Sequence, residues 1–377
     1  MGVPCVFLIV AFFTGVAGAF QIPTLSLYLA AELRVAPAAI GIFYMVNAAA
    51  GIGLSFGLAA LSDAIRVRRH LLMFCYLMAV GNSLLFAFNR QYLLLLIAGS
   101  FLTGVANSAM PQLFALAREY SEKPIFNALL RAQLSLAWVA GPPLAFIVIA
   151  SAGFTTLYLL TAGIFLIILL LSAILPTKRR EILPVSTAGQ ATAVKLRKKI
   201  GLLFIDSVLM WSCSALYLID APVYITQQLG IPEQSVGIIM GVAAAIEIPV
   251  IILAGRYVNR LGKKPMLIVA SGAGILFYSG FIIATSLWQL LFLQIFNALF
   301  IGIIATAGMF FFQSFLPERQ GVATTLFTNS VSVGVIFAGG LHVFLTKNGQ
   351  HEQVYIMAGA LLLIAGAILW RIDESLS

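Results

Sequence analysis

The sequence predicts an all-α membrane protein of twelve transmembrane helices arranged as two pseudo-symmetric six-helix bundles. Of its 377 residues, 61% are hydrophobic and only 9% are charged, which is too few charges to cover a soluble domain of this length. Apolar runs of about 20 residues, each long enough to cross a hydrocarbon core of about 30 Å, recur along the chain. The runs lack the alternation of barrel strands, so a helical bundle is the class that they predict.

The individual spans follow from these runs and from the short polar loops between them. The first run is too long for a signal peptide, lacks a cleavage pattern and is followed by further spans. An even number of spans places both chain termini on one side. We expect spans at residues 4–30, 38–60, 70–88, 92–115, 126–151, 154–176, 200–224, 234–256, 265–285, 287–311, 321–346 and 352–371.

The positive charge follows the membrane topology. The net charge of +9 suggests a nucleic-acid partner until the basic residues are placed in the loops. All but three of the 22 Lys and Arg residues fall on one side, and the exceptions are Arg34, Arg90 and Lys347. This positive-inside asymmetry predicts a multi-pass membrane protein with both termini in the cytoplasm and no nucleic-acid partner.

An internal repeat divides the chain. Gly41 and Gly237, which open equivalent spans, lie 196 positions apart, as do Asp63 and Asn259, which close them. The longest loop is basic, rich in small polar residues and central. We therefore expect a first bundle over residues 1–176, a cytoplasmic linker over 177–199 and a second bundle over 200–377.

The loop after the eighth span carries the clearest motif. Residues 255–264 read Gly-Arg-Tyr-Val-Asn-Arg-Leu-Gly-Lys-Lys, which resembles the loop signature of the major facilitator superfamily. The first-half copy at 59–68 keeps the acid Asp63 but loses the glycines, whereas the second copy has Asn259 in place of the acid. The alternative is an ordinary basic loop. We expect Asp63, Asn259 and Arg260 to act in gating.

Two further basic residues lie at span ends. Arg118 closes the fourth span and Arg131 opens the fifth. We expect both to act in cytoplasmic gating, although they could equally serve as surface charges or topological anchors.

Longer segments identify a family. They are GVAGAFQIPTLSLYL (15–29), NSAMPQLFALAREY (107–120), RAQLSLAWVAGPPLAF (131–146), IEIPVIILAGRY (246–257) and ATTLFTNSVSVGVI (323–336). Through them nearly the whole chain resembles the bacterial sugar efflux transporter family within the major facilitator superfamily. The resemblance implies alternating-access export of sugars and related glycosides, coupled to proton influx as an antiporter.

Three acids are placed inside spans, namely Asp206, Asp220 and Glu247. A carboxylate near a helix centre is costly in a bilayer, so it usually faces a cavity and has a function. Glu247, in the middle of the eighth span, is the first candidate for proton coupling, and Asp206 and Asp220 follow. The alternative for Glu247 is a permanently protonated acid that bonds a neighbouring helix.

Asp206 begins a stripe along the seventh span. Spacings of three and four place it on one helical face with Met210, Cys213, Tyr217, Asp220 and Tyr224. Such a face suits a cavity wall, with Asp220 near the outer gate. The alternative is that Asp206 pairs with a loop cation such as Lys199.

Neutral amides and aromatic residues are the candidate substrate ligands. Amides both donate and accept hydrogen bonds, as sugar hydroxyls require, and aromatic rings can cover the apolar face of a pyranose. Each amide alone could instead join two helices. The candidates are Gln21, Tyr44, Asn47, Asn107, Gln112, Trp138, Tyr217, Gln294, Asn297 and Asn329.

The remaining features argue against an enzyme. His70, His342 and His351 lie in loops or near span ends, and no nucleophile–base pair or metal-ligand set is apparent. We expect no cofactor and no bound metal, and a monomer embedded in the lipid bilayer that carries sugars and protons. Three alternatives stay open: a multidrug exporter of the same fold, a proton-linked sugar importer and a non-transporting membrane sensor.

Overall fold

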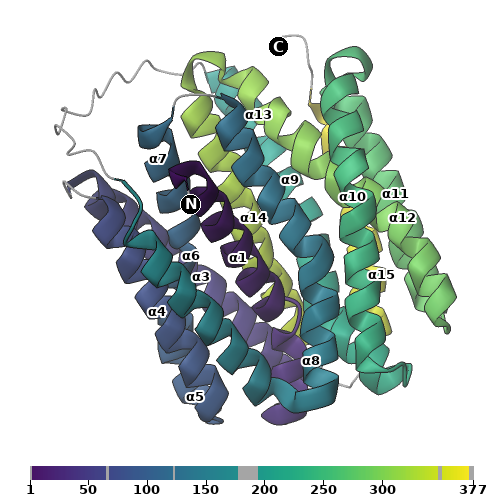
Figure 1. Ribbon diagram of the computed structural model, residues 1–377. Helices are drawn as coiled ribbons and strands as arrows, with labels where there is room; N and C mark the ends of the chain where they lie inside the picture. Colours follow the sequence, from purple (N-terminus) through teal and green to yellow (C-terminus); the bar gives the residue numbers. More distant parts are fainter. Residues whose placement is uncertain (1, 65–67, 122–123, 177–193, 347–349, 373–377) are drawn as a thin grey trace. The chain divides into compact units, whose positions relative to one another are not determined.

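The computed structural model describes residues 2–64, 68–121, 124–176, 194–346 and 350–372, and this part of the chain is helical without strands. Segments η1 to η4 are π-helical and η5 is a 3₁₀ turn. The first half contains α1 (Val3–Gln21), α2 (Leu25–Leu27), η1 (Tyr28–Glu32), α3 (Pro37–Ala64), α4 (Arg68–Phe88), α5 (Tyr92–Leu94), η2 (Leu95–Gly99), α6 (Ser100–Asn107), α7 (Ala109–Tyr120) and α8 (Pro124–Ser172). The second half contains α9 (Val194–Val223), η3 (Tyr224–Gln228), α10 (Glu233–Leu261), α11 (Lys263–Ile283), α12 (Leu287–Ile303), η4 (Ile304–Gly308), α13 (Met309–Phe315), η5 (Pro317–Arg319), α14 (Gln320–Leu345) and α15 (Glu352–Arg371) (Figure 1).

Helix α8 contains two of the predicted spans. Eleven stretches of the described chain are long and apolar enough to cross a membrane, and one of them, Leu129–Ser172, has 44 residues. A straight helix of that length would measure about 66 Å, roughly twice a hydrocarbon core. Gly153 interrupts it with φ 78° and ψ 173°, a conformation that only glycine adopts easily. The prediction of a twelve-helix membrane protein is therefore confirmed.

The chain forms two compact units by its internal contacts. The first contains residues 1–35, 46–186 and 232–241, and the second contains 36–45, 187–231 and 242–377. The two short exchanged segments, 36–45 and 232–241, occupy equivalent positions of the repeat. Residues 177–193 of the expected linker lie outside the described residues, and Val194 begins α9.

In the first unit, α8 packs against α1 and α4 (Figure 1). Glycine allows the close approach of α1, because a Cβ atom on Gly15 would lie 2.8 Å from the Cβ of Ala137. One on Gly141 would collide with that of Ala19. Large apolar side chains, including Phe7 of α1, then fill the core of this unit.

In the second unit, α9 packs against α14 and α15, while α11 packs against α12 and α15. Gly334 of α14 faces Trp211 of α9, where an added Cβ atom would lie 3.0 Å from the Trp211 Cβ. The hydroxyl groups of Ser207 and Ser330 are 2.8 Å apart and join the same two helices. These contacts hold α9, which carries two of the candidate acids, inside the unit.

Local backbone features repeat between the halves. The π-helical turns η1 and η3 begin at Tyr28 and Tyr224, which have the same spacing as the sequence repeat. The left-handed residues Arg34 (φ 50°) and Gly230 (φ 65°) follow them with that spacing too. Because π-helical turns are rare, these matches support the division into two related halves.

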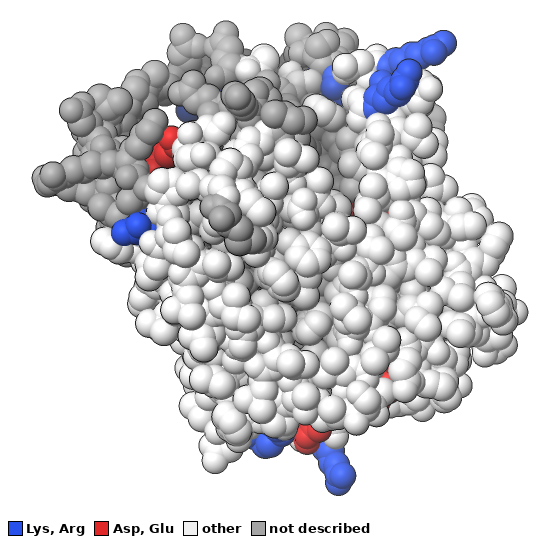
Figure 2. Space-filling view, in the orientation of Figure 1, with Lys and Arg blue, Asp and Glu red and all other residues white. Residues whose placement is uncertain are grey.

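Charged side chains concentrate at helix ends. On the face shown in Figure 2, lysine, arginine, aspartate and glutamate gather at the two ends of the helices, and the surface between them consists almost entirely of other residues. This surface belongs to a multi-pass membrane protein, because hydrocarbon excludes charged groups.

Candidate functional site

A buried acid and two histidines meet in the second unit. Asp220 lies in the last turn of α9 and is 0% exposed. The Nε2 atom of His342, from the last turn of α14, is 3.1 Å from Asp220 Oδ1. The Nδ1 atom of His351, at the start of α15, is 2.7 Å from the same oxygen. Two ring nitrogens thus donate to one carboxylate oxygen.

Aromatic rings surround this cluster. Tyr224 follows Asp220 by one helical turn, and its ring lies 6.3 Å from the His351 ring and 5.2 Å from the Tyr355 ring. Phe281 of α11 packs on Tyr355 at 4.7 Å. The ring packing excludes most water, which strengthens the electrostatic interactions of Asp220.

His351 is the part of the cluster nearest to solvent, with 12% of its side chain exposed against 2% for His342 and 0% for Asp220. Burial lowers the pKa of His351, but the hydrogen bond to Asp220 and the negative charge of that carboxylate outweigh burial, and the net effect raises the pKa. The imidazolium form of His351 therefore persists to higher pH than an ordinary histidine allows.

The sequence pointed to Asp220 as a candidate but gave no function to His342 and His351. Asp220 precedes the two histidines by 122 and 131 positions, so no helical periodicity connects them. The described residues contain no group of three His, Cys, Asp or Glu side chains placed to hold a metal ion. A carboxylate and two imidazoles are groups that bind and release protons.

The other two candidate acids differ from Asp220. Asp206 is 0% exposed, and neither of its carboxyl oxygens has a hydrogen-bond partner, so the alternative of a bond to Lys199 is not observed. Glu247 is half-buried on α10 and lies beside Gly302 of α12, where an added Cβ atom would be 3.5 Å from its Cγ. No described residue forms a hydrogen bond or an ion pair with Glu247. Neither acid has a partner that stabilises a negative charge.

The predicted stripe on α9 packs inside its own unit. Tyr217 is 5% exposed, and its ring lies 5.1 Å from Phe277 and 5.5 Å from Phe281, both of α11. Cys213 donates to the carbonyl of Ala358 in α15. The stripe shares one face, as predicted, and in this structure Tyr217 and Cys213 of that face contact α11 and α15.

Two amides of α12 bond each other. Asn297 Nδ2 donates to Gln294 Oε1 at 2.9 Å, and Gln294 Nε2 donates to the Leu290 carbonyl at 3.0 Å. Both are buried, and Asn297 Oδ1 has no hydrogen-bond partner. Asn329 of α14 is only half-buried. In this unit, Asn329 is the candidate amide most accessible to a ligand.

The candidates of the first half differ in exposure. Gln21 Nε2 donates to Ser83 Oγ at 3.0 Å, and Gln112 is buried. Asn47 and Trp138 are half-buried, whereas Asn107 is exposed. Tyr44, which is buried, lies in the 36–45 segment that packs with the second unit.

Known proteins resemble this chain along its length. The sequence profile of the Major Facilitator Superfamily matches residues 7–287 and 208–376. Sugar efflux transporter A of Escherichia coli (strain K12) is 49% identical over 97% of this chain and 94% of its own. The chain belongs to the bacterial sugar efflux transporter family of the major facilitator superfamily.

Two other comparisons agree with this family. Sugar efflux transporter B of Salmonella typhimurium is 39% identical over 98% of this chain and 95% of its own. The crystal structure of the nucleoside transporter NupG (D323A mutant) has a TM-score of 0.85 and 15% identity, and covers 99% of this chain and 100% of that one. The second match shows the shared fold.

In this sugar efflux family member, the basic loop after α10 also caps a helix. Lys264 Nζ donates to the carbonyls of Ile372 at 2.9 Å and Trp370 at 3.3 Å, at the end of α15. In the first unit, Arg69 does the same for Ala173 and Leu175 beyond α8, at 3.1 and 3.2 Å. Positive charge at a helix C-terminus is favourable, which explains one use of these loops.

The predicted gating residues are distributed along helix ends. Asn259, Arg260 and Arg131 are exposed. The side chains of Asp63 and Arg118 lie outside the described residues. Next to Arg118 in sequence, Glu119 forms an ion pair with Arg68 at 3.1 Å, joining α7 to α4.

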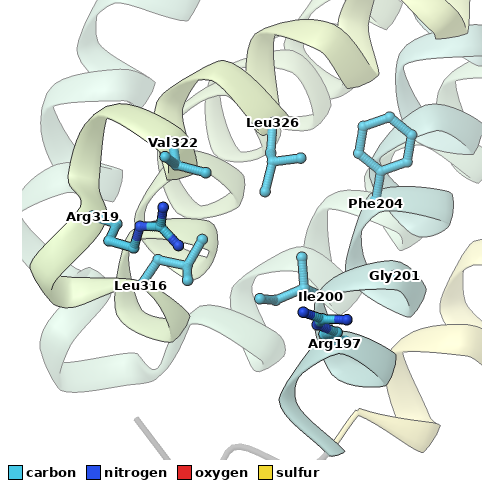
Figure 3. Close-up of a pocket in the computed structure, with 8 residues that line it drawn as sticks. All are labelled: Arg197, Ile200, Gly201, Phe204, Leu316, Arg319, Val322 and Leu326. Carbon is cyan, nitrogen blue, oxygen red and sulfur yellow. The ribbon is translucent and has the colours of Figure 1, made fainter. Parts of the chain in front are cut away.

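One hollow of about 370 Å³ opens in the second unit, at the N-terminal ends of α9 and α14 (Figure 3). It is lined mainly by apolar side chains, including Ile200, Phe204 and Leu326, together with Arg197 and Arg319. None of the predicted substrate ligands lines it.

Proposed function

We propose that this protein exports sugars and related glycosides across the bacterial inner membrane by proton antiport with alternating access. The 49% identity to Sugar efflux transporter A over 97% of the chain carries the substrate class. Its basic loops favour an orientation with both termini in the cytoplasm. We take it to act as a monomer whose halves, 1–176 and 200–377, take part in the alternation between inward-open and outward-open states.

Unpaired acids within spans support the proton coupling. Glu247 and Asp206 have no partner among the described residues to stabilise a negative charge, so each can change its protonation when water reaches it. Coupling requires that proton and sugar favour different conformations. We assign Glu247 the first role, because it is half-buried and can gain access to water with a small movement.

Half-buried polar groups are the favoured sugar ligands. Gln21, Asn47, Trp138 and Asn329 keep part of their surface free, and amides match the donor and acceptor pattern of hydroxyls. Tyr217, Gln294 and Asn297 are predicted ligands that are buried in this structure.

Transport in proteoliposomes tests this function. Counterflow of radiolabelled lactose and glucose should be saturable, and an imposed pH gradient should drive the sugars uphill. Failure of exchange by folded protein would contradict sugar transport and favour amphiphilic drugs as substrates. In Glu247→Gln, gradient-driven accumulation should fall at least tenfold, and an unchanged accumulation would overturn the role of Glu247.

A further inference from the structure

The charge balance around Asp220 favours an added proton. Among the described residues, the two histidines are the only ion-pair partners of this carboxylate. With both imidazoles neutral, the cluster would carry one uncompensated negative charge in the core of the unit, which is strongly unfavourable. One extra proton gives an imidazolium–carboxylate pair with no net charge. The geometry thus suits a cluster that holds one proton at rest.

The groups facing the cluster do not supply a permanent positive charge. Helix α9 and η3 contribute Tyr217 and Tyr224, and α15 contributes Tyr355 and the exposed carboxylate of Glu352. Helix α11 contributes the apolar ring of Phe281. Helix α14 contributes His342 alone. In the described part of the chain, any positive charge beside Asp220 therefore comes from a histidine.

His351 provides the route to water. Its Nδ1 atom bonds Asp220, which leaves Nε2 to take a proton, and it is the most exposed member of the cluster. The cluster lies at the C-terminal ends of α9 and α14 and the N-terminal end of α15. The basic residues Arg197, Lys264 and Arg371 lie at the opposite ends of α9, α11 and α15. Protons would therefore arrive from the side of the membrane without the basic loops.

The repeat makes this cluster specific to the second half. At the positions equivalent to Asp220 and His351, the first half has Thr24 and Thr155. Thr24 Oγ1 donates to its own helix at the Phe20 carbonyl, and Thr155 Oγ1 accepts from Arg90 at 2.8 Å. A permanently charged arginine thus occupies the place that titratable groups occupy in the second half.

We propose that Asp220, His342 and His351 form a proton-binding site that opens through His351 toward the outer side of the membrane and takes up the proton exchanged for sugar. The proton adds to His351 Nε2, and the resulting imidazolium is held by the Asp220 carboxylate. The role in exchange rests on the proposed antiport, whereas proton binding itself does not.

Histidine titration tests proton binding without sugar. The chain has three histidines, so protein labelled with ¹⁵N-histidine in nanodiscs gives three imidazole signals, which single variants assign. We expect the His351 signal to remain imidazolium above the ordinary titration near pH 6.5 and to lose this property in Asp220→Asn. His70 is exposed and lies outside the cluster, so His70→Gln is the matched control. Ordinary titration of His351, or a His351 titration unchanged in Asp220→Asn, would overturn the site.

A donor-preserving variant tests the role in exchange. In His342→Gln combined with His351→Asn, amide NH₂ groups replace the ring donors to Asp220 but bind no extra proton. Gradient-driven accumulation should fall at least tenfold relative to counterflow in the same vesicles, and His70→Gln should keep the wild-type ratio. An unchanged ratio in the double variant would refute the role in exchange. Absence of sugar flux from the wild-type protein would instead refute the proposed function and leave the titration result standing.

Discussion

The two halves build the same aromatic frame around opposite kinds of polar group. Each frame has two tyrosines and a phenylalanine at positions that match the repeat spacing of 196 to within one residue, with ring centroids 4.7–5.8 Å apart. The triads are Tyr28, Phe86 and Tyr158 in the first unit and Tyr224, Phe281 and Tyr355 in the second.

The polar groups explain why the frames differ in function. In the first unit, Arg90 donates to the carbonyls of Phe86 and Ala87 at the end of α4, contacts Glu32 at 3.3 Å and lies 5.4 Å from the centre of the Tyr28 ring. An arginine keeps its charge at any physiological pH. In the second unit, the carboxylate of Asp220 depends on imidazoles that gain and lose protons. The polar contacts of the first frame are thus independent of pH, whereas those of the second can respond to pH.

Removal of the Asp220 carboxylate should have the largest effect on stability. We expect Asp220→Asn to lower the free energy of unfolding by about 3 kcal/mol, because it breaks a buried ion pair and leaves its partners unpaired. The loss should depend on pH. Since Asp220 raises the pKa of His351, its stabilisation is fully present below about pH 6.5 and is lost as pH rises through the raised value.

Unfolding in detergent at pH 5.5 and pH 9 measures this dependence. The difference between wild type and Asp220→Asn should be larger at pH 5.5. An equal difference at both values would mean that the ion pair does not titrate, and the contrast between the two frames would then disappear.

The fixed frame should behave differently. Arg90→Gln should cost about 2 kcal/mol through its lost charge-assisted bonds to the α4 carbonyls, with little contribution from the half-exposed Glu32. The cost should be the same from pH 5.5 to pH 9. Arg34→Gln, an exposed arginine from the same end of the first unit, is the control and should change stability by less than about 0.5 kcal/mol. If the loss of unfolding free energy caused by Arg90→Gln varied with pH, the contacts of Arg90 would not be independent of pH.

Substitutions at the left-handed residue that follows each π-helical turn should have the smallest effects on stability. Gly230 has φ 65° and its equivalent Arg34 has φ 50°, so only the first half places a side chain in the left-handed region. Gly230→Ala should cost about 1 kcal/mol, and Arg34→Gly should stabilise by about 0.5 kcal/mol as strain is relieved. Denaturant unfolding of both variants decides the point, and effects of the opposite sign would show that strain does not distinguish the turns.

Hydropathy and spacing predicted most of the fold. The twelve spans came from apolar runs, and the shared spacing of Gly41 with Gly237 reappears in the π-helical turns at Tyr28 and Tyr224. The spans were predictable because each depends on a local length of apolar sequence that must cross the bilayer. The interruption of α8 at Gly153 became apparent only from the backbone dihedral angles of the structure, since composition does not determine a φ angle.

The candidate site was predictable only in part. Asp206, Asp220 and Glu247 are conspicuous because acids are rare in spans. His342 and His351 were overlooked, because histidines near span ends are ordinary and their partner lies more than a hundred positions away. The helical face that carries Tyr217 was predicted, but the helices that pack against this face were not. Periodicity groups residues on one helix without indicating what packs against them.

Proton movement driven by sugar is the most direct test of the central claim. Proteoliposomes containing a pH-sensitive dye would receive a lactose or glucose gradient with no imposed pH gradient. We expect proton flux opposite to the sugar flux, and we expect it to fall at least tenfold both in Glu247→Gln and in His342→Gln with His351→Asn. Sugar flux without proton flux in the wild-type protein would contradict the proposed antiport.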